Sequence, residues 1–144
     1  MPLLLVTPFY AGVLGILFVV LSAWVVKTRV GSGITFGDPG DRSPALFRWV
    51  RTHGNFAEYV PFALLLMTYL ELTRWSAFLL HVLGIVLVVG RLTHAVGLHR
   101  ANDVNVFRQI GVALTFGVIT VAAVLAIATS IGAWTTLSTL AAMG

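Results

Sequence analysis

Cysteine is absent from this sequence of 144 residues, charged residues make up only 10% of it, and acidic residues number five. Without cysteine the chain can form no disulfide, no thiolate metal site and no cysteine nucleophile, so any thiol in its chemistry has to belong to a ligand. A soluble domain carries about 25% charged residues, whereas this chain is 58% hydrophobic with a mean hydropathy of +0.97. The composition excludes an ordinary soluble domain and indicates an integral membrane protein.

Four long apolar runs predict four membrane spans. Each is close to or longer than the roughly 20 residues that cross a bilayer. The expected helices cover about residues 3–26, 44–73, 75–97 and 106–133. They occupy the chain as one domain of residues 1–144, so the expected fold is an all-α integral membrane protein, a bundle of four transmembrane helices. The first run has no basic residue before it and is longer than the apolar core of a signal peptide, which predicts a retained helix.

Local signals define the helix ends and contacts. Ser43 before Pro44 is typical of an N-cap and first helical residue, Pro61 is expected to kink the second helix, and Gly97 is expected to cap the third. Small residues four positions apart are typical of helix contacts in lipid. Such pairs occur at Ala11/Gly15, Ala113/Gly117, Ala122/Ala126 and Ala128/Gly132.

Positive charge is distributed unevenly between the two predicted membrane surfaces. Every lysine and arginine except Arg74 lies near one of two connections, the first-to-second or the third-to-fourth: Lys27, Arg29, Arg42, Arg48, Arg51, Arg91, Arg100 and Arg108. The positive-inside rule therefore predicts that both connections are cytoplasmic and both termini lie outside, as in a bacterial inner membrane protein. The net charge of +4 is then a topology signal rather than a nucleic-acid footprint.

One polar stripe interrupts the apolar second helix. At 3.6 residues per turn, five side chains project within roughly 80° of one another, with a sixth at the edge. They are Arg48, Arg51, Asn55, Glu58 and Phe62, with Tyr59 at the edge. A charge at the bilayer centre costs about 2.5 to 3.5 kcal/mol on insertion scales, so this face has to look into protein, water or a ligand.

Further cations are expected at the membrane level of this stripe, namely Arg29, Arg91, His94 and Arg108. Guanidinium groups bind carboxylates and a carboxylate binds an amine, so the set suits a small zwitterionic ligand with excess negative charge. In the alternative interpretation, Glu58 pairs with an arginine across the bundle and the loop-side cations contact lipid phosphates. We prefer the ligand interpretation for Asn55 and Glu58, which lie deeper. The lipid interpretation is preferred for Lys27, Arg29, Arg42 and Arg100.

The four histidines do not form a metal site by their spacing. His53 lies about 160° around the helix from Arg51, and His81 is expected near the opposite surface, as a packed or interfacial residue, far from the histidines that end the third helix. A zinc site needs converging ligands, commonly two histidines four residues apart on a helix. No metal site is expected, and His94 is the histidine placed near chemistry.

Two motifs stand out along the second and third helices. The first reads Arg51-x-x-x-Asn55-x-x-Glu58-Tyr59-x-Pro61, and the second reads Gly90-Arg91-x-x-His94-Ala95-x-Gly97. Together with the length, the four spans and the long first connection, they resemble the MAPEG family, the membrane-associated proteins in eicosanoid and glutathione metabolism. The resemblance implies a homotrimer of four-helix subunits, with glutathione as co-substrate held between neighbouring subunits on the cytoplasmic side.

The resemblance also implies roles for single residues. It implies contacts to glutathione from four positions of the second helix, Arg51, Asn55, Glu58 and Tyr59. It further implies that His53 reaches glutathione from the adjacent subunit and that Arg108 is associated with the thiol. The chain departs from the better-known eukaryotic members at two tyrosine positions, where it has His94 and Leu98. The wording H-G-N-F-A-E-Y-V-P is similar to the small bacterial branch.

Two functions stay open at this point. In the first, the chain is a glutathione transferase or peroxidase in which Arg108, with His94, holds the thiolate for attack on a lipophilic electrophile or hydroperoxide arriving through the bilayer. A nearby cation lowers the pKa of a cysteine thiol from about 8.5 and so raises its thiolate fraction. In the second, the chain is a non-catalytic glutathione- or lipid-binding membrane scaffold, which the missing tyrosine favours. A transporter or channel is disfavoured because inverted-repeat and filter signatures are lacking.

Overall fold

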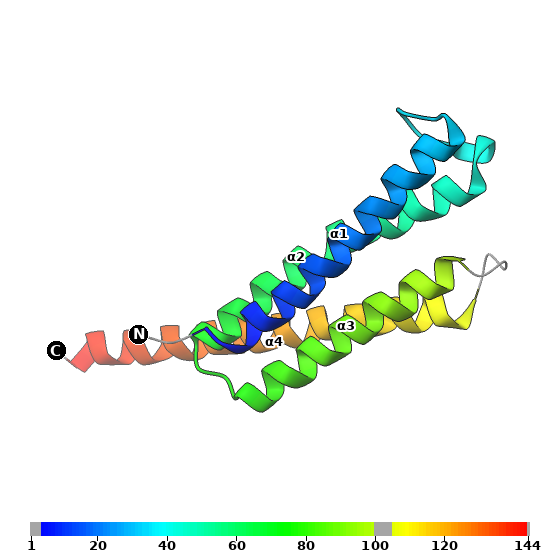
Figure 1. Ribbon diagram of the computed structural model, residues 1–144. Coiled ribbons are helices and arrows are strands. Elements are labelled where there is room, and N and C mark those ends of the chain that lie inside the picture. The colour runs from blue at the N-terminus through cyan, green and yellow to red at the C-terminus, as the bar shows by residue number, and fades with distance from the viewer. Residues whose placement is uncertain (1–3, 100–104, 144) are drawn as a thin grey trace.

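The structure of the protein is a computed structural model that describes residues 4–99 and 105–143. It is a bundle of four helices with a short 3-10 helix, η1, before the second (Figure 1). In chain order the helices are α1 (Val6–Ser32), η1 (Gly40–Arg42), α2 (Pro44–Leu72), α3 (Ala77–His99) and α4 (Val106–Met143). Figure 1 shows α1 starting near the end of the bundle where α4 finishes. The end of α1, the start of α2, the end of α3 and the start of α4 lie at the other end, here called the loop end.

Three of the helices, α1, α3 and α4, are long and apolar enough to cross a membrane. The fourth, α2, has 29 residues and is also long enough, but its polar stripe makes it less apolar. The predicted all-α, multi-pass membrane bundle is confirmed. The orientation of the loop end toward the cytoplasm remains a prediction from charge.

Two helices extend further than the sequence predicts. α1 continues through Lys27 to Ser32 and ends at Gly33, whose left-handed φ of 67° suits glycine and whose N–H bonds the Val30 carbonyl at 3.3 Å. α4 continues past Ala133 to Met143. Serine and threonine hydroxyls in its last turns donate to backbone carbonyls three or four residues earlier. These polar residues are therefore compatible with a helix, although their composition predicts a loop. The ends of α2 and α3 agree within about two residues.

The start of α2 follows the predicted capping chemistry. The Ser43 hydroxyl accepts a hydrogen bond from the Leu46 N–H at 3.4 Å, and Pro44 is the first helical residue, where its missing N–H costs nothing. Pro61 lies inside α2, and it leaves the Ala57 carbonyl without its usual helical donor. α2 therefore begins at a fixed position, which places its polar stripe about one to five turns from the start of the helix.

Glycines bring α3 and α4 close together. A Cβ added to Gly97 would lie 2.4 Å from the Arg108 amide nitrogen, and one added to Gly111 would lie 2.6 Å from the His94 Cβ. Side chains at either position would collide with the facing helix. Gly97 is therefore a buried contact residue within α3, and the prediction that it caps the helix was wrong. Three glycines of the predicted small-residue pairs have open space around them instead, namely Gly15, Gly117 and Gly132.

A single carboxylate ties the start of α1 to the end of α2. Glu71 accepts hydrogen bonds from the backbone N–H groups of Leu5, Val6 and Thr7 at 2.6, 2.7 and 2.7 Å. The first turn of a helix leaves its N–H groups without helical partners, and Pro8 has no N–H to offer. Glu71 therefore satisfies the first turn of α1 and places a negative charge at the positive end of its dipole.

Other polar side chains at this end also pair across helices. The Tyr10 hydroxyl bonds His81 Nδ1 at 3.0 Å, so His81 is a packing residue near the surface, as expected. Trp75 Nε1 donates to Thr129 Oγ1 at 3.0 Å. These bonds join α1 to α3 and the α2–α3 turn to α4.

Candidate functional site

Arg91 on α3 is the buried arginine at the centre of the loop end. Its side chain is 3% exposed. Its Nη1 donates to Asn55 Oδ1 on α2 at 2.8 Å, and its Nη2 donates to the Gly111 carbonyl on α4 at 3.5 Å. Its Nε is buried without a hydrogen-bond partner in the part of the chain that the structure describes. Among the described residues, no carboxylate contributes to the electrostatic surroundings of this guanidinium.

The helix-packing glycines explain how this guanidinium reaches α4. A Cβ on Gly90 would lie 3.2 Å from Thr115 Oγ1 and 3.3 Å from the Gly111 carbonyl oxygen, so the two backbones approach beside Arg91. The same Gly111 carbonyl accepts a hydrogen bond from Thr115 Oγ1 at 2.8 Å. Gly111 and Thr115 were not among the predicted site residues. Their signal in the sequence is a glycine and a threonine on one face of an otherwise apolar helix, one turn after Arg108.

His94 and Arg108 lie next to this centre, as the sequence predicts. His94 is 4% exposed and packs against Gly111, and it interacts electrostatically with both Arg91 and Arg108. The N–H of Arg108 donates to Asn105 Oδ1 at 3.2 Å, while Asn105 Nδ2 donates to the Gly97 carbonyl at 2.9 Å. Asn105 thereby caps α4 and ties it to the end of α3, which fixes the backbone that carries Arg108.

The polar stripe of α2 is divided between the bundle interior and the surface of the protomer. Asn55 and Tyr59 are partly buried, and the Tyr59 ring packs on Phe116 of α4 with ring centroids 5.4 Å apart. Arg51 and Glu58 are exposed.

Two further predicted site residues lie near the loop end with different environments. Arg29 donates to the carbonyls of Ile34 and Gly37, all at 3.3 Å, so its guanidinium holds the α1–α2 connection. Arg48 interacts electrostatically with His99 at the end of α3, and its Nε is buried without a hydrogen-bond partner.

His53 faces α1 of its own protomer. Its Nε2 lies 3.0 Å from Ser22 Oγ, and its ring stacks on Phe18 with centroids 4.6 Å apart. It therefore lies on the opposite side of α2 from Arg51, as its helical angle predicts. Among residues 4–99 and 105–143, no three histidine, aspartate or glutamate side chains gather as a metal site would require.

This arrangement of four helices and two polar motifs can be compared with known proteins. The sequence model described as "MAPEG family" matches residues 7–128. The chain belongs to the MAPEG family. It is 36% identical over 95 residues to "Inner membrane protein YecN" of Escherichia coli (strain K12), which covers 66% of this chain and 71% of that protein. The protein of the same name from Escherichia coli O6:H1 matches equally. No solved structure matches this MAPEG chain.

Proposed function

We propose that this MAPEG protein binds glutathione at the loop end and uses it as a thiol co-substrate, in a transferase or peroxidase reaction on lipophilic electrophiles or hydroperoxides. The observation that carries the proposal is Arg91. Its buried guanidinium is held by α2 and α4. In the part of the chain that the structure describes, it has one donor without a partner and no carboxylate beside it. A buried charge is stable only when counter-charge or hydrogen bonds compensate it, and an anionic ligand would supply both.

The surrounding charges match the ends of a small zwitterionic peptide. Exposed Arg51 can bind a carboxylate, and exposed Glu58 can bind an amine two turns deeper along α2. Arg91 and Arg108 both lie close enough to His94 to affect it electrostatically, and we assign Arg108 and His94 to the thiol. A positive charge beside a thiol stabilises the thiolate, which is the attacking species. The thiolate sulfur then bonds to the electrophilic atom as the leaving group departs with its electron pair.

A ligand bound through Arg51 and Glu58 lies at the surface of the protomer, where a second subunit can cover it. We therefore propose a homotrimer with the ligand between subunits. The outward-facing glycines Gly15, Gly117 and Gly132, which have open space in the single chain, support close contacts between copies. The name of the Escherichia coli relative supports an inner-membrane location for this chain as well.

Isothermal titration of glutathione into the detergent-solubilised protein tests the proposal. The expected result is saturable binding together with ultraviolet absorbance of the bound thiolate at neutral pH. S-methylglutathione is the matched control ligand, since it keeps the carboxylates and amine but cannot form a thiolate. Binding of both ligands without thiolate absorbance would favour the non-catalytic scaffold, and failure of glutathione to bind would overturn the proposal. Crosslinking that saturates at a dimer would contradict the trimer.

A further inference from the structure

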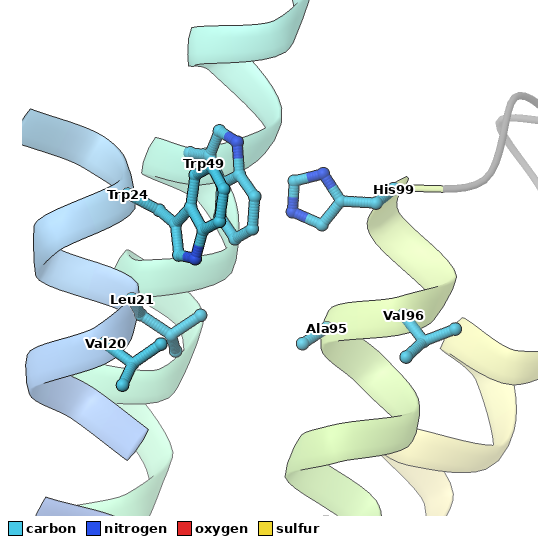
Figure 2. A pocket seen from close by; sticks show the side chains of 7 residues that line it. All are labelled: Val20, Leu21, Trp24, Trp49, Ala95, Val96 and His99. Atoms are coloured by element: carbon cyan, nitrogen blue, oxygen red, sulfur yellow. The ribbon is translucent and has the colours of Figure 1, made fainter. Parts of the chain in front are cut away.

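A groove lies one to two turns nearer the loop end than Arg91, where α3 faces α1 and α2. It is a groove of about 480 Å³, lined by residues of α1, α2 and α3 (Figure 2). Its lining residues are Val20, Leu21, Trp24, Trp49, Ala95, Val96 and His99. The α3 residues that face it are distinct from Arg91 and His94, which contact α4. The volume falls within the range of about 300 to 1,000 Å³ that is typical of small-molecule sites.

Aromatic rings form one wall of the groove. The Trp24 and Trp49 rings stack with centroids 5.1 Å apart and an interplanar angle of 6°, and His99 approaches Trp49 with ring centroids 3.7 Å apart. Figure 2 shows the two indoles on one side of the groove, with the imidazole of His99 facing them from α3. Below the rings the lining is aliphatic, from Val20 and Val96. The groove is therefore polar at the loop end and apolar toward the membrane interior.

Two basic side chains and an imidazole lie at the aromatic end, and two of their nitrogen atoms lack hydrogen-bond partners among the described residues. The Lys27 ammonium lies 4.7 Å from the centroid of the Trp24 ring. Arg48 Nε and His99 Nε2 are both buried without a hydrogen-bond partner in the described part of the chain. Arg48 lies close enough to His99 to disfavour a charge on the imidazole, so a cationic guanidinium adjoins a neutral ring nitrogen with no described carboxylate between them. Buried donors of this kind carry a desolvation cost that an anionic acceptor would relieve.

We propose that this groove binds an anionic phospholipid of the surrounding membrane, with an acyl chain along the aliphatic lining and the phosphate at Lys27, Arg48 and His99. The aliphatic lining fits a hydrocarbon chain, and the cations and unpartnered donors fit a phosphate that accepts several hydrogen bonds. Tryptophan rings are suited to this depth, because their apolar body and polar N–H match the boundary between headgroups and acyl chains. The site is independent of the glutathione proposal.

Fluorescence quenching by brominated lipids tests this site directly. In a Trp75→Phe/Trp134→Phe chain, the emitting tryptophans are the two that line the groove. The protein is reconstituted into phosphatidylcholine vesicles containing an equal small fraction of acyl-brominated phosphatidylglycerol or acyl-brominated phosphatidylcholine. We expect stronger quenching by the anionic lipid. Ala95→Phe, which fills the groove, should reduce that excess, and the unmodified chain should show the same excess at smaller amplitude.

Charge variants distinguish lipid binding at this groove from non-specific attraction of the protein to an anionic membrane surface. Lys27→Gln and Arg48→Gln should each weaken the preference roughly fivefold, which corresponds to about 1 kcal/mol for a basic residue near the membrane surface. Arg42→Gln is the matched control, because Arg42 lies at the same end but donates to the Asp38 carbonyl at 3.1 Å. Equal quenching by both lipids would overturn the proposal. So would an excess that survives Ala95→Phe, or that falls as much in Arg42→Gln as in Arg48→Gln.

Discussion

The two ends of the bundle differ in whether their polar groups have hydrogen-bond partners within the protomer. Where the chain begins, Glu71 takes up the free N–H groups of α1, and aromatic and hydroxyl side chains bond across helices. At the loop end, three buried nitrogen atoms lack partners among the described residues, those of Arg48, Arg91 and His99. The exception at the first end is the Thr7 hydroxyl, which lies beside the Glu71 carboxylate.

This difference separates polar groups that stabilise the fold from polar groups that we propose bind a ligand. A bond completed within the protomer stabilises the bundle whether or not a ligand is present. A buried donor left without an acceptor lowers stability by about 1 to 3 kcal/mol, so three such atoms at one end of the bundle favour acceptors supplied from outside the protomer. Substitutions at the first end should therefore change stability, whereas many at the loop end should change binding.

The largest expected effect on stability comes from Gly97. This residue lies at the loop end but has a packing role, so it is an exception to the difference between the two ends. Gly97→Ala places a methyl group 2.4 Å from the Arg108 nitrogen, against backbone that cannot move aside. Overpacking of a core costs about 1 to 3 kcal/mol or more, and we expect the upper end or a failure to assemble. Gly117→Ala, with nothing within 4 Å, is the control for the helix-propensity gain. Thermal unfolding in detergent measures both, and equal melting temperatures would contradict the packing assignment.

Glu71→Ala tests the first end. It leaves the three N–H groups at the start of α1 without their acceptor, and hydrogen bonds to a charged group contribute about 1.5 to 3 kcal/mol. We expect a loss of that order in the free energy of unfolding, a smaller loss in Glu71→Gln, which keeps one carbonyl acceptor, and unchanged glutathione affinity. A fall in glutathione affinity comparable to the loss of stability would contradict the assignment of structural roles to the first end and binding roles to the loop end.

Most of the bundle could be predicted from sequence, because span length and hydropathy are local properties. The start of α2 was predictable for the same reason, since Ser43 and Pro44 act on their own helix. The ends of α1 and α4 were not, because serine, threonine and lysine side chains are compatible with both loop and helix. Glu71 was missed entirely, since its partners lie more than 60 residues away in the sequence.

The candidate site was predicted in its members but not in its arrangement. Helical periodicity places Arg51, Asn55 and Glu58 on one stripe, and the structure keeps them there. Periodicity on one helix cannot show that Asn55 bonds Arg91 inside the bundle while Arg51 and Glu58 stay exposed. That division depends on how closely α3 and α4 pack, and therefore on glycines whose contacts lie on another helix.

Binding at the loop end is tested by Arg51→Ala and Glu58→Gln. Each removes one end of the proposed charge-matched site, at a cost of about 1.5 to 3 kcal/mol for a charge-assisted hydrogen bond, or roughly a tenfold to hundredfold rise in the glutathione dissociation constant. Both side chains are exposed in the protomer, so the melting temperature without ligand should change little. Titration calorimetry gives the affinities, with Arg42→Ala as the loop-end control. Unchanged affinity in both variants would remove these residues from the site.

The smallest change in binding is expected at Arg108, where the loss should appear in chemistry. If Arg108 faces the thiol, its charge stabilises the thiolate more than the thiol, so Arg108→Ala should raise the pKa of the bound thiol, by about one unit, while affinity near neutral pH changes less. A higher thiol pKa means less thiolate below that pKa, so conjugation of a model electrophile should slow roughly tenfold at neutral pH and recover as pH rises.

Arg108→Lys distinguishes charge from geometry at the same position. Lysine keeps the positive charge but not the planar guanidinium, so its thiol pKa and turnover should fall between wild type and Arg108→Ala if electrostatics dominates. The measurements are thiolate absorbance against pH and the rate of conjugation for the three proteins. An unchanged thiolate titration in Arg108→Ala, with binding intact, would falsify the assignment. Because His94 and Arg91 interact electrostatically within the same cluster, stabilisation of the thiolate would then pass to one of them.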